Sequence, residues 1–295
     1  MICDIMIAMT IKKYLQQIDD LANKEVLVTG GTSGIGLSIV KHLLYKHADV
    51  VILARNMTKA KEVKNNLEKQ YPNSHIDLIE YDQSKNDSVV KAASIVLKEH
   101  PNFYAMVLNA GLIETKKHMT FTDEIPTTIK TNYVGTALLV KELLPHLKEG
   151  QRLIFQGSLC AMLKTKHIDT LKEKNLSMWQ QYFISKSGVE ALFHHYAMMD
   201  NQQPSFYLVE PGVTSTAIIR DFPFVIRHLG KVFLKVASHS SDKAALTAML
   251  AMNASTPKNS FIVPRGFLAI RGYPKIKKFS EKRKREYLVD LLETK

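Results

Sequence analysis

Two residues four positions apart, Tyr182 and Lys186, have side chains suited to proton transfer. On a helix, positions i and i+4 share a face, so the lysine ammonium can lie beside the phenol. An ammonium stabilises a phenolate and lowers the pKa of the phenol from its ordinary value of about 10. A lowering of about three units needs about 4 kcal/mol, which requires a sheltered site. Such pairs also occur by chance, so the surrounding elements decide the interpretation.

The stretch VTGGTSGIG, residues 28–36, places four glycines between a β-rich run and a helical pattern. Gly30, Gly34 and Gly36 suit a tight turn whose backbone lies close to a pyrophosphate at a helix N-terminus. Glycines alone would be a weak signal. The strand before, the helix after and a further strand about twenty residues later indicate a dinucleotide-binding turn.

These motifs lie in a chain of alternating β-rich and helical segments. The β-rich runs are almost continuously apolar, as expected of strands that helices cover on both faces. There are seven such runs, at residues 25–30, 49–55, 75–82, 104–111, 151–158, 205–212 and 260–264. The alternation predicts an α/β fold: a doubly wound, seven-stranded parallel sheet with helices on both faces.

Polar or glycine residues end most of these strands. In doubly wound sheets, ligands bind beyond the carboxyl ends of the strands. The residues at those ends are Gly30, Arg55, Asp82, Asn109, Ser158 and the pair Pro211 and Gly212. We therefore expect the binding site at this edge of the sheet.

The glycine spacing TGxxxGxG is similar to that of the short-chain dehydrogenase/reductase family. Further motifs follow in the family's order: NAG at 109–111, NYVG at 132–135, YFISK at 182–186 and PGVTST at 211–216. Several motifs in register are far more specific than any one of them. The resemblance spans residues 25–270 and implies a Rossmann fold and a nicotinamide-dependent oxidoreductase.

The resemblance also implies a role for each catalytic residue. Ser158 would hold the substrate carbonyl oxygen and Tyr182 would pass it a proton. Lys186 would bind the ribose hydroxyls and, with the charge of the oxidised nicotinamide, tune Tyr182. Asn132 would hold a water in the proton relay behind Lys186. No metal is expected, because the histidines and cysteines lack ligand spacing.

The end of the second strand favours NADP(H) over NAD(H). NAD-binding sheets usually place a carboxylate there for the ribose 2′-hydroxyl, whereas this chain has Ala54 and then Arg55, which can bind a 2′-phosphate. By resemblance, Asp82 would meet the adenine, Asn109 would bound the adenosine pocket, and the 213–216 stretch would meet the carboxamide. The whole expected cofactor site comprises Gly30, Thr32, Ser33, Gly34, Ile35, Gly36, Arg55, Asn56, Asp82, Gln83, Asn109, Ala110, Gly111, Tyr182, Lys186, Pro211, Gly212, Val213, Thr214 and Thr216.

Ser158 and Tyr182 are 24 residues apart, a longer spacing than is usual in the family. This spacing, the sequence HIDTL at 167–171 and the run from TFTDEI at 120–125 to TNYVG resemble the branch that contains retinol dehydrogenases and protochlorophyllide reductases. We expect the chain to resemble this branch, but we do not assign the substrates of the branch to it.

The segment FPFVIRHLGKVFLKV, residues 222–236, places apolar side chains on one helical face and basic ones on another. In the family this region covers the substrate, so residues 214–240 are expected to form an apolar lid over a hydrophobic carbonyl or alcohol. A basic amphipathic helix is also typical of a membrane-surface anchor, and that interpretation stays open.

The composition is that of one globular unit, with 295 residues, 45% hydrophobic and 23% charged. We expect an N-terminal extension at 1–23, the NADP-binding catalytic domain at 24–270 and a basic C-terminal helical tail at 271–295. The net charge is +12, and KIKKFSEKRKR at 275–285 supplies half of it. That run can meet phosphate or lipid, but it is more often a solvated face. Two cysteines and no signal peptide favour a reducing cytoplasmic location, with peripheral membrane contact left open.

Other functional classes fit the residues less well. A catalytically silent NADP(H)-binding regulator would normally lose Tyr182 or Lys186, and both are present. A nucleic-acid binder would rest on charge alone, without interleaved aromatic residues. We therefore expect a reductase of hydrophobic carbonyl compounds, with a homodimer and a homotetramer both left open.

Overall fold

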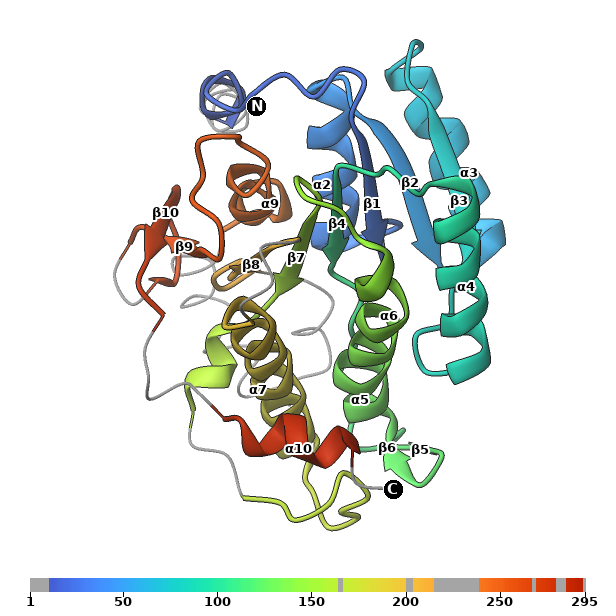
Figure 1. Cartoon of the computed structure of the whole chain (residues 1–295), viewed down its shortest axis with the longest axis vertical. Helices are drawn as coiled ribbons and strands as arrows, with labels where there is room; N and C mark the ends of the chain where they lie inside the picture. Colours follow the sequence, from blue (N-terminus) through green and yellow to red (C-terminus); the bar gives the residue numbers. More distant parts are fainter. Residues whose placement is uncertain are drawn as a thin grey trace.

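The apolar runs form a single eight-stranded sheet (Figure 1). The computed structural model describes residues 11–163, 167–199, 204–214, 239–266, 269–279 and 285–293. In order across the sheet, the strands are β10 (Pro274–Lys277), β9 (Phe261–Pro264), β8 (Ser205–Val209), β7 (Arg152–Gln156), β4 (Ala105–Leu108), β1 (Glu25–Thr29), β2 (Asp49–Ala54) and β3 (Ile76–Glu80). β2 and β3 lie on one side of β1, and the strands of this sheet from β4 onward lie on its other side. In such folds ligands bind at this switch point, between β1 and β4.

Helices cover both faces of this sheet, and each face has its own apolar core. Alternate strand residues supply the two cores, so that Leu27 faces one and Val26 and Val28 face the other. On one face lie residues 11–21, α2 (Gly34–Tyr45), α3 (Met57–Gln70) and α9 (Ser241–Leu250). On the other lie α4 (Asn86–Glu99), α6 (Gly135–Leu143), α7 (Met178–Ala197) and α10 (Tyr287–Glu293). The predicted doubly wound α/β fold is confirmed.

Shorter elements complete the second face. The helical stretch that leads into α6 begins with α5 (Thr127–Ile129) and continues through one π-helical turn, η1 (Lys130–Val134). A two-stranded hairpin, β5 (Phe121–Thr122) and β6 (Ile125–Pro126), precedes it. Two 3-10 turns, η2 (Leu144–His146) and η3 (Leu159–Met162), follow α6 and β7.

The sheet has one strand more than the sequence predicted. β10 pairs antiparallel with β9, in a register that sets Pro274 opposite Pro264 and Lys277 opposite Phe261. Its lysines led us to expect a tail, although proline and lysine are residues that suit an exposed sheet edge. The sheet therefore extends past residue 270, and the described part of the tail is helical at 287–293.

The described part of the N-terminal extension is packed into the molecule. Ile11, Leu15, Ile18 and Leu21 are buried in the same core as α2 and α9. The backbone N–H of Asp19 also donates to the side chain of Asn253, which follows α9, at 2.8 Å. Residues 11–21 thus cover one face of the sheet.

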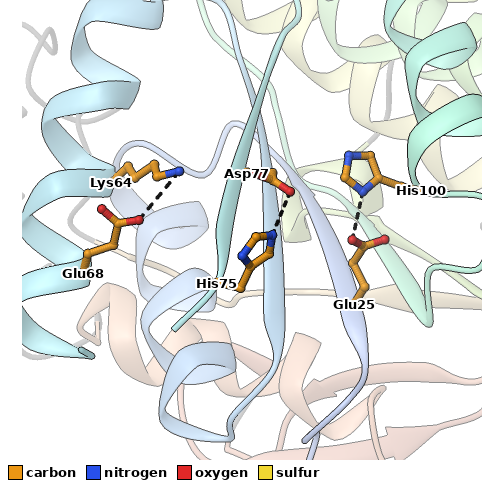
Figure 2. A network of polar contacts seen from close by, with 6 residues as sticks. All are labelled: Glu25, Lys64, Glu68, His75, Asp77 and His100. Carbon is orange, nitrogen blue, oxygen red and sulfur yellow. Dashed lines mark hydrogen bonds and ion pairs between the residues drawn. The ribbon is translucent and has the colours of Figure 1, made fainter. Parts of the chain in front are cut away.

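The amino-terminal half of the sheet carries polar contacts away from the predicted site (Figure 2). His100 Nδ1 lies 2.8 Å from the carboxylate of Glu25, which begins β1, and His75 Nε2 lies 3.0 Å from Asp77 in β3. Both pairs are at the edge where the parallel strands start. The opposite edge, where the strands end, is left for the residues described next.

Candidate active site

The glycine turn after β1 has the shape that its sequence predicted. Gly30 and Gly34 have φ values of 70° and 54°, the left-handed region that glycine tolerates best. A Cβ at Gly36 would lie 2.3 Å from the carbonyl oxygen of Gly30, so that position admits glycine alone. A Cβ at Gly34 would meet nothing within 4 Å, because the turn opens on that side.

The helix N-terminus behind this turn suits an anion. The side chain of Ser33, the N-cap of α2, makes no capping hydrogen bond, and the first turn carries no acidic residue. The first-turn N–H groups and the helix dipole therefore favour negative charge there. Together with the open cradle at Gly34, this arrangement fits the pyrophosphate of a dinucleotide.

The NAG turn is fixed against the glycine turn by hydrogen bonds between neighbouring strands. The hydroxyl of Thr29 accepts the backbone N–H groups of Asn109 and Ala110, at 3.0 and 2.9 Å. The Asn109 amide donates to the carbonyl oxygen of Thr29 at 3.0 Å. Asn109 thus holds together the two loops at the ends of β1 and β4, beside the expected adenosine pocket.

The residues after β2 and β3 differ in how far their side chains are available. Arg55 is exposed directly after β2, and Asn56 caps α3 by accepting the Lys59 N–H at 2.9 Å. Asp82 Oδ1 accepts two hydrogen bonds from Ser84, at 3.1 and 2.7 Å.

Gln83 turns inward. Its Nε2 donates to the Thr131 carbonyl oxygen at 2.6 Å and to the Thr136 hydroxyl at 2.9 Å. Its side chain therefore braces the helix that carries Asn132, and a cofactor contact from Gln83 would have to come from its backbone.

Ser158, Tyr182 and Lys186 come together where β7 ends and the first half of α7 passes. Tyr182 and Lys186 lie on the buried side of α7, with 8% and 7% of their surfaces exposed, and Ser158 is near enough to Tyr182 to influence its pKa. A capping box fixes the start of this helix, because Ser177 and Gln180 each accept the other's backbone N–H. Lys186 Nζ donates to the Gln156 carbonyl oxygen at 2.9 Å, which ties α7 to the end of β7.

Asn132 reaches the same place from the π-helical turn η1. Its amide bonds with both backbone groups of Leu112, each at 2.7 Å, and donates to the Ser185 hydroxyl at 3.1 Å. A Cβ at Gly111 would lie 3.1 Å from Asn132 Oδ1 and 3.7 Å from Lys186 Nζ. The amide and the lysine therefore both lie beside Gly111, and the proton relay through Asn132 stays a prediction.

Burial controls the protonation of this cluster. It raises the pKa of Tyr182 to about 12, with nearby Cys160 also raising it and the hydrogen bond from Ser158 lowering it. Burial lowers the pKa of Lys186 to about 8, while Cys160 and Glu190 raise it. In the protein alone the pKa of Tyr182 is therefore raised, because desolvation outweighs the stabilisation of a phenolate, and the lowering expected with the oxidised nicotinamide present stays a prediction.

The PG motif forms a tight turn whose backbone is already engaged. Gly212 has a φ of 73°. The N–H of Val213 donates to the Ile270 carbonyl oxygen at 2.8 Å, and its carbonyl oxygen accepts the His239 N–H at 3.0 Å. The expected carboxamide contact from the Val213 backbone would therefore compete with protein partners. Thr216 and lid residues 215–238 lie outside the described residues.

Several buried polar residues around the cluster were not singled out from the sequence. Glu190 and Glu210 are fully buried, Cys160 follows Ser158 by two residues, and neither amide atom of Gln156 has a hydrogen-bond partner within the described residues. Glu190 could have been found, since it stands one helical turn beyond Lys186. The others carry no spacing signal.

The chain is similar to several known proteins. The family model described as short chain dehydrogenase matches residues 24–223. A short chain dehydrogenase of Arthrobotrys oligospora is 26% identical over 81% of this chain and 82% of its own length. The polyprenol dehydrogenase of Homo sapiens is 24% identical over 80% of this chain and 74% of its own. A metagenomic short-chain oxidoreductase, solved in complex with NADP, shares the fold with a TM-score of 0.59 and 22% identity, covering 81% of this chain and 96% of that one.

Among the described residues, no helix combines the length and the apolar character needed to cross a bilayer.

Proposed function

Because the chain belongs to the short-chain dehydrogenase/reductase family of oxidoreductases, we propose that it is an NADP(H)-dependent enzyme that reduces a hydrophobic carbonyl compound to an alcohol. The observation that carries the proposal is the cluster of the half-buried Ser158 with the buried Tyr182 and Lys186, at the same sheet edge as the glycine turn. Chance pairs of tyrosine and lysine on a helix do not come with a hydroxyl partner and an anion-binding helix N-terminus.

The described residues offer places for the pyrophosphate, the nicotinamide ribose and the 2′-phosphate of NADP(H), which supplies the hydride when bound. The cradle at Gly34 and the N-terminus of α2 would hold the pyrophosphate, and Lys186 would hold the nicotinamide ribose. Arg55 would hold the 2′-phosphate, because it is exposed at the end of β2 and no carboxylate stands in its place. The NADP complex of the metagenomic relative supports this choice of cofactor.

The protonation of Tyr182 supports the reducing direction. With its pKa raised to about 12, the phenol keeps its proton at physiological pH. It would donate that proton to the oxygen of a substrate carbonyl as the carbon accepts a hydride, while the Ser158 hydroxyl holds the same oxygen.

The substrate is proposed to be apolar. The alternating apolar and basic faces of residues 222–236 support this, as does the name of the human relative, a dehydrogenase of polyprenol, which is an apolar alcohol. We place the enzyme in the cytoplasm, with contact at a membrane surface where such substrates partition.

The test is NADPH consumption by the purified full-length chain with a panel of hydrophobic aldehydes, ketones and quinones. Tyr182→Phe removes the proton donor and should lower kcat by about 10²–10⁴-fold. Tyr196→Phe removes a hydroxyl from the same helix outside the cluster and should leave kcat unchanged. Tight NADPH binding without turnover of any compound would instead indicate a silent regulator.

A further inference from the structure

The end of the basic tail lies against the elements that carry the catalytic residues. Arg285 donates from Nη1 to the carbonyl oxygen of Ala161 at 2.9 Å and to the Ser187 hydroxyl, and from Nη2 to the carbonyl oxygen of Leu163 at 3.0 Å. One guanidinium therefore joins the end of η3 to the middle of α7.

The next residues of the tail extend the same contact. Leu288 is fully buried, and its carbonyl oxygen accepts the hydroxyl of Tyr133, which is itself packed against Gly188. The ring of Tyr287 lies 4.5 Å from that of His167, in the segment between Ser158 and Tyr182. Figure 1 shows α10 lying across α7 and the helix that leads into α6. We call residues 285–288 the C-terminal latch.

Three of the latch contacts lie close in sequence to catalytic residues. Ala161 belongs to η3, which Ser158 caps, Ser187 follows Lys186, and Tyr133 follows Asn132. The latch thus touches all three elements whose side chains form the cluster, from outside the cluster itself.

The chemistry of Arg285 suits this task. The last carbonyl groups of a short 3-10 turn have no partner within the turn, and a planar guanidinium can donate to two of them at once. Ser158 lies between the end of β7 and η3, which it caps, and Tyr182 lies on α7. A bridge between η3 and α7 therefore fixes the separation of the two hydroxyls that would share the substrate oxygen.

We propose that the C-terminal latch, through Arg285, holds η3 against α7 and so positions Ser158 relative to Tyr182 for catalysis. Arg285 is a positioning residue, since it does not touch the cluster. The catalytic part of this inference rests on the proposed function, whereas the structural part can be measured without a substrate.

Cys160 is a reporter for the structural part, because it is half-buried between Ser158 and Ala161. In a Cys3→Ser chain it is the single thiol, and its labelling rate with an aromatic disulfide reports opening of η3. Arg285→Ala removes the hydrogen bonds that join η3 to α7, so η3 should open more often. Labelling of Cys160 should then be about tenfold faster. Loss of the positive charge alone would raise the thiol pKa and slow labelling, so the two effects have opposite signs.

Matched variants separate the latch from general effects. Arg285→Lys keeps the charge but loses the fork, so its labelling rate should lie between those of the parent and Arg285→Ala. Lys277→Ala removes a charge from the same tail on the exposed edge strand and should label as the parent does. Leu67→Ala destabilises the distant core under α3, and Cys160 in this variant should also be labelled at the parent rate. Labelling of Arg285→Ala at or below the parent rate would overturn the proposal.

The catalytic part is tested by separating binding from turnover. Arg285→Ala should lower kcat by about 10- to 100-fold, as expected for a small displacement of reacting groups, while NADPH affinity stays within about twofold because the glycine turn is untouched. Retained NADPH affinity also shows that the variant is folded. A loss of affinity equal to the loss of kcat would contradict positioning. If the parent chain reduces no carbonyl, the proposed function fails, and the labelling rates still decide whether the latch exists.

Discussion

Tyr182 shows how burial selects one role for a side chain that could serve two. A phenol in water can act as an acid or, with help, as a base, but a water-poor site disfavours its charged form. The alkoxide formed when a carbonyl accepts a hydride is a far stronger base than a phenolate, so proton donation from Tyr182 remains favourable even with its pKa raised to about 12. The polypeptide is thus prepared for donation.

Arg55 carries the choice of cofactor in a single side chain. If its contact with a 2′-phosphate contributes about 1.5–3 kcal/mol, Arg55→Ala should lower the preference for NADPH over NADH by about tenfold or more. The measurement is the ratio of kcat/KM for the two cofactors. Lys59→Ala, which removes an exposed cation one turn along α3, serves as the control. An unchanged ratio for Arg55→Ala would assign the preference to other residues.

At this scale the sequence predicted which residues reach the edge of the sheet, but not how each side chain turns. Tyr182, Lys186 and Ser158 could be placed because a helical turn and a strand end fix their directions. Gln83 could not, since its inward turn depends on acceptors at Thr131 and Thr136 that are distant in the sequence. Arg285 was part of a charge run, and nothing in that run marks one arginine as a structural bridge.

Among the elements, the glycine turn has the least freedom to change. Gly36→Ala would set a methyl group 2.3 Å from the Gly30 carbonyl oxygen. Because that oxygen belongs to the backbone, it can move away only if the turn opens. We expect a loss of NADPH affinity of about tenfold or more, together with about 1–3 kcal/mol of destabilisation. Equilibrium binding by NADPH fluorescence and chemical unfolding measure the two effects.

Gly150→Ala provides the matched control for this turn. Gly150 has a φ of 89° and open space around its Cβ position, so alanine there adds backbone strain without a collision. It should lower stability and leave NADPH affinity unchanged. Equal losses of affinity in both variants would show that strain, and not the collision at Gly36, weakens binding.

The seven predicted strands are all present because continuous apolar runs bounded by glycine or polar residues have few other interpretations. β10 was not predicted because an exposed edge strand does not need apolar side chains on its exposed faces. Lys275, Ile276 and Lys277 therefore give no periodic signal. The expected branch of the family and the apolar lid stay predictions.

For the whole molecule, the active site lowers the stability of the fold. Lys186 has a pKa of about 8 when folded and 10.5 as its ordinary value, so below pH 8 it is charged in both states and burial costs its full amount. Between these values the unfolded chain binds more protons, and stability rises with pH. Above 10.5 the cost is gone.

Lys186→Met should therefore stabilise the fold by about 1–3 kcal/mol at pH 7, net of the hydrogen bond lost to Gln156, while abolishing turnover. Chemical unfolding of both chains at pH 7 and at pH 10.5 measures the effect. The gain should shrink at the higher pH. A gain that does not change with pH would mean that packing, and not the buried charge, is its source.

The π-helical turn at Lys130–Val134 sets the direction of the side chain of Asn132. A π turn is one residue wider than an α turn, as though a single residue had been inserted into a regular helix. Deleting that residue would make the backbone more regular, but it would also rotate one part of the helix by about 100° relative to the other. Asn132 would then point away from Leu112 and Lys186. The irregular turn therefore exchanges a regular backbone for the direction of one side chain, since it carries the Asn132 amide to Leu112 and Ser185.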